Sequence, residues 1–393
     1  MCWIHLTINR MENLIITNWD GVDAASFYTY QSTHNPLIYS HEHNLWVANS
    51  YAHCKSILSS IDTKVPQPAI PANGLLNEKA LLMLNTLVRI NNGEKHQQAR
   101  AAAILLYEHI KGVDIGEVMS ALLVGISQSS FDWVSIVCKR LPVLAILNGL
   151  SFTGQDSEWI VEHIAELNKI MLPNKTEQDV DVINSVVEKY YALSANYINN
   201  HPLTDQFIKT AGNISRQEAT DLLICNVLGL FIQSYDACRA LLTISAMTLA
   251  KLKTERVAIQ SNAVFYQKLI NELLRIDPPV HNTRRIAAED IQLGDQVIKA
   301  GQTILVVMGA ANMDHMVFSS PEHFDIERGN NAANLTFGLG GHACIAKYFC
   351  TDLAIATCRH LVDQYDGIQV VPQQIRYEPQ LNVKMAKQLL VTL

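Results

Sequence analysis

The stretch FGLGGHACIAK, residues 337–347, places one cysteine at the end of a short glycine-bearing loop, directly before a segment, Ile345–Leu361, with the pattern of a helix. A thiol at a helix N-terminus lies near free backbone amides and the positive end of the helix dipole, which favour the thiolate. Glycines at positions 338, 340 and 341 let the backbone approach a flat partner, because no Cβ intervenes. A thiolate presented in this way can be an axial ligand to haem iron, and the alternative for such a residue is a buried structural cysteine; the loop by itself leaves both readings open.

The segments around this loop are mostly helical in pattern. Apolar residues recur at three- and four-residue spacing in five segments, 78–90, 97–113, 157–172, 178–200 and 216–252. The last is expected to be a helix of roughly 30 residues, long enough to cross a domain. Short β-like runs with turn signals between them occur at 284–298, 302–311, 367–373 and 387–393. The sequence therefore predicts a mainly α-helical fold with small β-sheets, in a single domain spanning residues 1–393.

Composition limits the class of protein. The chain has 393 residues, 49% of them hydrophobic, which is enough for one large core. Its 30 basic and 37 acidic residues give a net charge of −7, which argues against a nucleic-acid binder. Eight cysteines without a CxxC pair indicate free thiols in a reducing cytoplasm. We find no signal peptide and no uninterrupted run of about 18 apolar residues, so we expect no membrane span. If Met11 is the initiator, residues 1–10 are a disordered extension.

Several motifs in order resemble the cytochrome P450 family, over essentially the whole chain. The haem-binding loop of that family is matched by Phe337, Gly338, Gly340, His342, Cys344 and Ala346, with alanine where the last glycine is usual. Upstream, Glu272 and Arg275 in ELLR match the family's ExxR helix, where positions i and i+3 share one face. The stretches AANMDH, 310–315, and HFDIER, 323–328, follow at family-like separations.

The resemblance implies a cytochrome P450 fold with haem b between the long central helix and the helix after Cys344. It implies that Glu272, Arg275 and Arg328 form a buried polar network beside the cysteine loop. Haem propionates need cationic or hydrogen-bonding partners when they are buried. The residues that the resemblance assigns to cofactor binding are His96, Arg100, Arg285, Phe337 and His342, together with Cys344 as the metal ligand.

The long helix departs from the family at its oxygen-activating pattern, which falls on residues 233–238. The acid is kept as Asp236, but Ala237 stands where the family has a threonine whose hydroxyl helps to deliver protons. Alanine cannot donate a hydrogen bond. Ser234 or a water held by Gln233 is one replacement, and a donor group on the substrate is another. A third reading is a different reaction: oxidative coupling, ring closure, desaturation or a peroxide-driven oxidation.

The resemblance implies a substrate pocket that includes residues 65–84, the long helix near Leu230, Gln233 and Ala237, and the stretch Val280–Thr283. His281 and Asn282 are its polar candidates and favour a substrate with a hydrogen-bonding group. We expect oxidation of a small secondary metabolite, with electrons from a ferredoxin or flavodoxin-type protein. The resemblance places Lys95, Lys347 and Arg359 toward the cysteine side, where the electron donor could dock; the alternative is that they are ordinary solvated residues. The rival interpretation is a non-catalytic haem-binding sensor or docking protein, which gives no role to Asp236.

Overall fold

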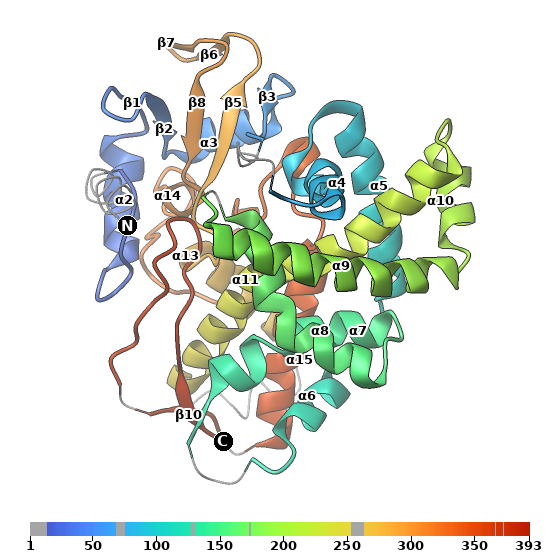
Figure 1. Cartoon of the computed structure of the whole chain (residues 1–393). Helices are drawn as coiled ribbons and strands as arrows, with labels where there is room; N and C mark the ends of the chain where they lie inside the picture. Colours follow the sequence, from blue (N-terminus) through green and yellow to red (C-terminus); the bar gives the residue numbers. More distant parts are fainter. Residues whose placement is uncertain are drawn as a thin grey trace. The chain divides into compact units, whose positions relative to one another are not determined.

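The computed structural model describes residues 14–67, 75–126, 130–172, 174–252, 263–365, 367–371 and 373–393 (Figure 1). The chain forms two compact units. Unit 1 comprises Met1–Lys64, Ile115–Lys139 and Asp236–Leu393, and unit 2 comprises Val65–Asp114 and Arg140–Tyr235. The extension expected at residues 1–10 lies outside the described residues. The single domain expected from the sequence stays a prediction.

All the regular secondary structure in the described residues of unit 2 is helical. Its helices are α4 (Glu78–Thr86), η1 (Val88–Ile90), α5 (Gly93–His109), α7 (Leu141–Gly149), α8 (Gly154–Asn168), η3 (Lys169–Met171), α9 (Glu177–Asn199), α10 (Leu203–Ala211) and the first part of α11 (Arg216–Lys251). Local sequence sets where they begin. Thr176 caps α9 by accepting a hydrogen bond from Asp179 N, while the Asp179 carboxylate accepts one from Thr176 N. Asn77 caps α4 in the same way by accepting from Ala80 N.

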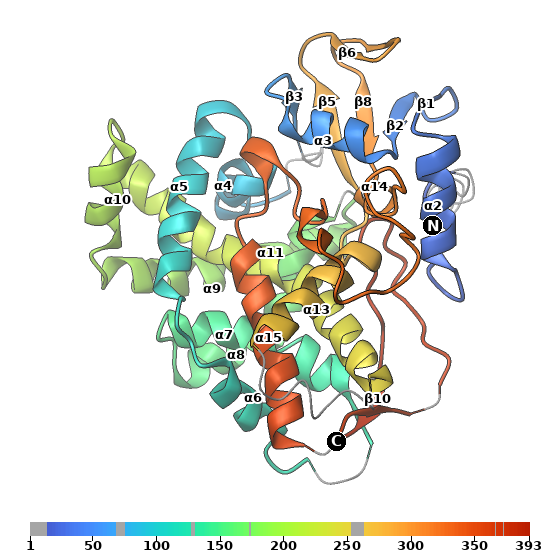
Figure 2. The same cartoon turned by 180° about the vertical axis from the view of Figure 1, so that it is seen from behind.

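Unit 1 contains the rest of α11 and a further set of helices. These are α2 (Ala24–His34), α3 (Tyr51–Ser59), α6 (Ile115–Leu123), the π-helix η2 (Val134–Cys138), α13 (Ala263–Ile276), α14 (Met308–Ala311), η4 (Asn331–Ala333), η5 (Gly340–His342) and α15 (Lys347–Gln364). Within this unit α13 and α15 lie side by side (Figure 2). Helix α15 begins at Lys347, two residues later than the pattern predicts, because the chain stays non-helical through the loop and its first turn closes with Cys350 N donating to Ala346 O.

Unit 1 also holds all the described strands. A five-stranded sheet has the order β1-β2-β8-β5-β3, a three-stranded sheet the order β4-β10-β9, and β6 and β7 form a hairpin. Their bounds are β1 (Leu37–Ser40), β2 (Leu45–Ala48), β3 (Thr63–Lys64), β4 (Phe131–Asp132), β5 (Thr283–Ala287), β6 (Ile291–Leu293), β7 (Gln296–Ile298), β8 (Thr303–Val306), β9 (Gln369–Val370) and β10 (Leu390–Thr392). The β-like run expected at 302–311 ends early, because its last residues form α14.

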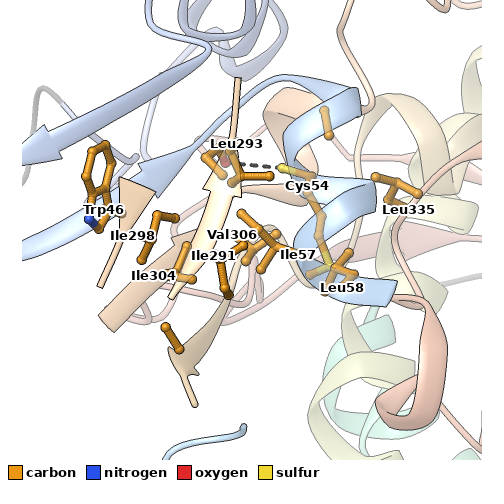
Figure 3. Packing of buried hydrophobic residues seen from close by; sticks show 14 residues of the cluster. Trp46, Cys54, Ile57, Leu58, Ile291, Leu293, Ile298, Ile304, Val306 and Leu335 are labelled. Carbon is orange, nitrogen blue, oxygen red and sulfur yellow. Dashed lines mark hydrogen bonds between the residues drawn. The ribbon is translucent and has the colours of Figure 1, made fainter. Parts of the chain in front are cut away.

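The core of the larger sheet packs against α3 (Figure 3). Trp46 and Ile304 come from the paired strands β2 and β8, and Ile57 comes from α3. The Cys54 thiol lies 3.2 Å from the carbonyl oxygen of Ala48 and is the dashed contact in Figure 3. Leu335 belongs to the same cluster, and Leu339 packs against it. The start of the cysteine loop is therefore held to the sheet by apolar burial.

Helix α11 is the one helix in the described ranges that is long and apolar enough to cross a membrane by length and composition. It has 36 residues, and 83% of its most apolar window is buried inside the structure. Burial of this kind is what a core helix of a globular protein shows, so its apolar surface is used for packing.

Candidate functional site

The cysteine loop closes on itself through backbone hydrogen bonds. Cys344 N donates to Phe337 O at 2.8 Å, and Gly338 N donates to Leu335 O at 2.8 Å. Cys344 is exposed, whereas the other cysteines in the described part of the chain are buried: Cys54, Cys138, Cys225, Cys238, Cys350 and Cys358. The loop thus presents one accessible thiol from a short, internally bonded turn, which is the form that a metal ligand needs.

Gly340 brings this loop against α3. Its φ is +68°, a conformation that favours glycine, and a Cβ there would lie 2.7 Å from Leu58 O and 3.2 Å from Ser59 Cα. Backbone atoms cannot move away as a flexible side chain can. A glycine is therefore required at this position, while Gly341 beside it has open space around the place of a Cβ.

A buried ion-pair network lies behind the loop. The Glu272 carboxylate accepts from Arg275 at both oxygens, Nη2 to Oε1 at 2.7 Å and Nε to Oε2 at 2.9 Å. Arg328 Nε donates to the same Oε1 at 3.1 Å. Glu272 and Arg275 are fully buried, and Arg328 is 8% exposed. One carboxylate therefore serves two guanidinium groups, and backbone carbonyls must satisfy their remaining N–H groups.

Those carbonyls connect the network to the loop. Arg275 Nη1 donates to Pro321 O at 2.8 Å and to Asn312 O at 3.1 Å. The side chain of Asn312 in turn accepts from Leu335 N at 2.7 Å and donates to Thr336 Oγ1 at 2.9 Å. Leu335 and Thr336 immediately precede Phe337. The network therefore orients the segment from which the cysteine loop starts.

Arg285 is a buried cation on β5. It is 4% exposed, and its Nη1 donates to Arg284 O at 2.9 Å and to Thr283 Oγ1 at 3.2 Å. Burial lowers its pKa to about 10. Among the residues that the structure describes, no carboxylate lies within ion-pair distance of its guanidinium. A buried guanidinium with only neutral acceptors fits an anionic ligand such as a haem propionate. His342 lies in η5 of the same unit.

In unit 2, His96 and Arg100 lie one turn apart on α5. His96 is 7% exposed, and burial together with the positive charge of Arg100 lowers its pKa. Its imidazole is therefore neutral near pH 7 and offers a single ring N–H. This pair has the chemistry to bind a carboxylate, with a charged and a neutral donor side by side.

Helix α11 carries the residues expected to handle protons. Gln233 Nε2 donates to Gly229 O of its own helix at 3.1 Å. Ser234 is 1% exposed, and its Oγ has no hydrogen-bond partner among the described residues. Asp236 and Ala237 follow in the same helix, where α11 passes into unit 1. Ser234 is thus a buried hydroxyl with a free donor.

Three of the residues expected at the substrate pocket contact the C-terminal segment. Val280 pairs with Val383, and Asn282 Nδ2 donates to Leu381 O at 2.8 Å. His281 N donates to Asn382 O at 2.8 Å. The sequence pattern did not reveal this segment as their partner. Helix α11 reaches it too, because Arg239 donates to Ala386 O at 3.0 Å and pairs with Glu378 at 3.2 Å.

The His281 ring itself lies in the core of unit 1. It is fully buried, with ring centroids 4.2 Å from Trp19 and 5.5 Å from Tyr28. A Cβ on Gly309 would come within 3.0 Å of its Nδ1, so the packing is tight. Neither ring nitrogen has a hydrogen-bond partner among the described residues, and a substrate contact by His281 stays a prediction.

Comparison with known proteins finds similarity to one family. The Cytochrome P450 family model matches residues 256–354, which include the ELLR helix and the cysteine loop. The chain is 22% identical over 360 residues to the biotin biosynthesis cytochrome P450 of Bacillus subtilis, covering 88% of this chain and 90% of that protein. It is 29% identical over 216 residues to 6-deoxyerythronolide B hydroxylase of Saccharopolyspora erythraea, about half of each chain.

Solved structures share the fold. The structure of P450BioI in complex with hexadec-9Z-enoic acid ligated acyl carrier protein matches with a TM-score of 0.79 at 21% identity, over 94% of this chain and 98% of that one. The mainly helical fold with small sheets predicted from the sequence is therefore confirmed as a cytochrome P450 fold. Together with the cysteine loop and the ELLR network, these matches make the chain similar to the cytochrome P450 family of haem-dependent monooxygenases over most of its length.

Proposed function

We propose that this protein oxidises a small secondary metabolite in the cytoplasm, with O2 and with electrons from a separate redox protein. The observation that carries the proposal is Cys344, an accessible thiol on a loop that is oriented by the Glu272 network. Hydroxylation is the expected outcome for two reasons. Asp236 supplies the acid of the family pattern, and the buried hydroxyl of Ser234 lies two residues before it in the same helix.

The cofactor is expected to be haem b. Cys344 would bind its iron, and Arg285 and His342 would bind propionates. His96, Arg100 and Phe337 stay predicted cofactor-binding residues. When bound, the haem supplies the redox chemistry that activates O2.

The protein's own part in the reaction is to move protons and exclude water. Ser234 Oγ–H is a donor without a partner among the described residues, so it is available to a water or a substrate oxygen. The Asp236 carboxyl group is the acid that would resupply the proton from solvent. Ala237 has no proton to give, so donation depends on Ser234, on a water held by Gln233, or on the substrate itself.

The electron donor is expected to dock by charge. Lys347 and Arg359 are exposed on α15, and each lies over an aromatic ring, Lys347 Nζ at 5.9 Å from Phe337 and the Arg359 guanidinium at 5.6 Å from Tyr266. Ring contacts limit where these cations lie. Exposed cations near the cysteine loop suit a small acidic ferredoxin or flavodoxin. Lys95 of unit 2 is exposed as well.

A second candidate substrate is an acyl chain carried by a protein. It is favoured by the breadth of the match to the biotin biosynthesis cytochrome P450, 90% of that protein, and by the likeness to P450BioI bound to acyl carrier protein. Val280 packs with Ala240, Val383 and Met385 in an apolar cluster of unit 1. Free and carrier-bound substrates therefore belong in one screen.

The first experiment measures iron ligation. The purified protein, reduced under carbon monoxide, is expected to show the red-shifted Soret band of thiolate ligation. Cys344→Ala should lose that band, whereas Cys225→Ala, which removes a buried thiol, should keep it. Folded wild-type protein without the band would refute the haem-thiolate assignment.

The second experiment measures turnover. With a surrogate ferredoxin, its reductase and NADPH, one candidate substrate should gain an oxygen atom from labelled O2. A product that lacks the label would favour coupling or desaturation, and turnover with peroxide alone would favour a peroxide-driven enzyme. Intact haem with no product from any substrate would support the non-catalytic alternative.

A further inference from the structure

Two buried thiols lie against each other in unit 1. The Sγ atoms of Cys238 on α11 and Cys350 on α15 are 2.9 Å apart, although the residues are 112 positions apart in the chain. Cys238 is 1% exposed and Cys350 4%. A disulfide has an S–S distance of about 2.05 Å, so bond formation requires an approach of under about 1 Å.

Two other buried thiols of this unit have oxygen partners instead. The Cys54 thiol lies 3.2 Å from Ala48 O, and Cys138 Sγ accepts from Thr243 Oγ1 at 3.4 Å. Within the described ranges, no group of three or more His, Cys, Asp or Glu side chains is arranged to hold a metal ion. The Cys238–Cys350 pair is therefore arranged for reaction between its own two sulfurs.

We propose that Cys238 and Cys350 are an oxidisable pair that a hydroperoxide converts to a disulfide linking α11 to α15. One thiol attacks the O–O bond of hydrogen peroxide, which gives a sulfenic acid and one water. The second thiol attacks the sulfenic sulfur, forms the S–S bond and releases a second water. Two thiols and one peroxide thus become one disulfide and two waters.

The position of the pair determines which parts of the protein the disulfide would join. Cys238 lies two residues after Asp236, and Cys350 six residues after Cys344. A disulfide there ties the helix segment of the candidate proton-handling residues to the helix that follows the candidate iron ligand. Peroxide is the by-product expected when oxygen is reduced without oxidising substrate, so, resting on the proposed function, the bond would form in enzyme that is running uncoupled.

The pair is expected to react slowly at neutral pH. The hydrogen bond with Cys238 and burial raise the pKa of Cys350, so this thiol keeps its proton. Because the thiolate is the nucleophile, the oxidation rate should rise with pH. A slow reaction suits a pair that responds to sustained rather than brief peroxide.

The test maps thiols in the folded, haem-loaded protein. Hydrogen peroxide is added in graded doses at pH 7 and pH 9, the remaining thiols are alkylated, and the protein is digested without reduction for mass spectrometry. We expect a linked peptide that contains Cys238 and Cys350, formed faster at pH 9 and lost on reduction with dithiothreitol. The thermal midpoint of the oxidised protein should rise, because the link restricts the unfolded chain.

Matched variants separate this pair from other thiols. Cys350→Ala should abolish the linked peptide and the rise in midpoint, and Cys238→Ala is the equivalent change on the other helix. Cys358→Ala removes another buried thiol of α15 and should leave the link intact. In the same samples, the Soret band of the reduced carbon monoxide complex reports separately on iron ligation by Cys344.

The proposal is overturned if peroxide doses that oxidise Cys344 leave Cys238 and Cys350 as free thiols at both pH values. It is also overturned if either thiol is found linked elsewhere. Neither of these two measurements requires turnover, and both can be made on folded protein whether or not it binds haem. Failure of this proposal and failure of the proposed function are therefore distinguishable.

Discussion

The carboxylate of Glu272 binds the guanidinium of Arg275 through both oxygens, at 2.7 and 2.9 Å, and both side chains are fully buried. Arg328 shares the same carboxylate. Glu272→Gln removes the one negative charge and leaves two buried cations uncompensated. We expect a loss of about 3 kcal/mol in the free energy of unfolding, measured by urea denaturation, together with lower haem content.

The exposed pair Lys268–Glu327 provides the matched control, since it joins the same kinds of charge at the surface, where the Glu327 side chain is 72% exposed. Glu327→Gln should change stability little, because solvent screens the pair. Equal losses in Glu272→Gln and Glu327→Gln would contradict the role given to the buried network.

The contact of Gly340 with α3 predicts a large effect from one methyl group. In Gly340→Ala the Cβ would lie 2.7 Å from Leu58 O, and the positive φ adds about 1 kcal/mol or more. We expect reduced haem content per chain and a lower thermal midpoint. Gly341→Ala, one residue on, meets no atom within 4 Å and should resemble the wild type. If both variants retain haem equally, the loop does not depend on its approach to α3.

Arg285 is predicted to bind a propionate. Arg285→Leu removes the buried guanidinium and should weaken haem retention at least tenfold, the equivalent of about 1.4 kcal/mol for one charge-assisted hydrogen bond. Transfer of haem to apomyoglobin measures the loss. Its neighbour Arg284 is exposed on the same strand, so Arg284→Leu is the control and should lose haem at the wild-type rate.

Ser234 is predicted to donate the proton that Ala237 cannot. Ser234→Ala should raise the peroxide released per NADPH consumed several-fold, because oxygen reduction then lacks its donor. Ser245→Ala, in the same helix and equally buried, is the control and should not change coupling. Unchanged peroxide release in Ser234→Ala would assign donation to the substrate or to a water at Gln233.

The lowered pKa of His281 predicts how the free energy of unfolding depends on pH. Burial, and secondly the positive charge of Lys384, hold its pKa well below 6.5. Below about 6.5 the unfolded chain binds a proton that the folded chain does not, so the free energy of unfolding falls as the pH decreases through this window. His281→Phe and His281→Leu should both flatten this dependence between pH 7 and 5, whatever their absolute stabilities. An unchanged slope in both would show that other groups cause it.

The sequence by itself determined the features that depend on neighbours in the chain. The spacing from Phe337 to Cys344 sets a loop that closes with one backbone hydrogen bond, and Glu272 and Arg275 share a helix face whatever surrounds them. The Thr176–Asp179 cap begins α9 in the same local way. Such features were predictable because short-range geometry and helical periodicity are properties of the local sequence.

Only the tertiary structure decided which distant residues meet. Strand β2 lies parallel to β8, more than 250 residues later. The sequence of neither strand indicates which strand it pairs with. The His281 ring packs against Trp19, which lies more than 250 residues earlier in the chain, and against Tyr28. Cys238 and Cys350 looked like two of eight scattered thiols until α11 and α15 brought their sulfurs together. Such contacts follow from how whole helices and sheets bury their apolar surface, and that depends on the complete chain rather than on any one segment.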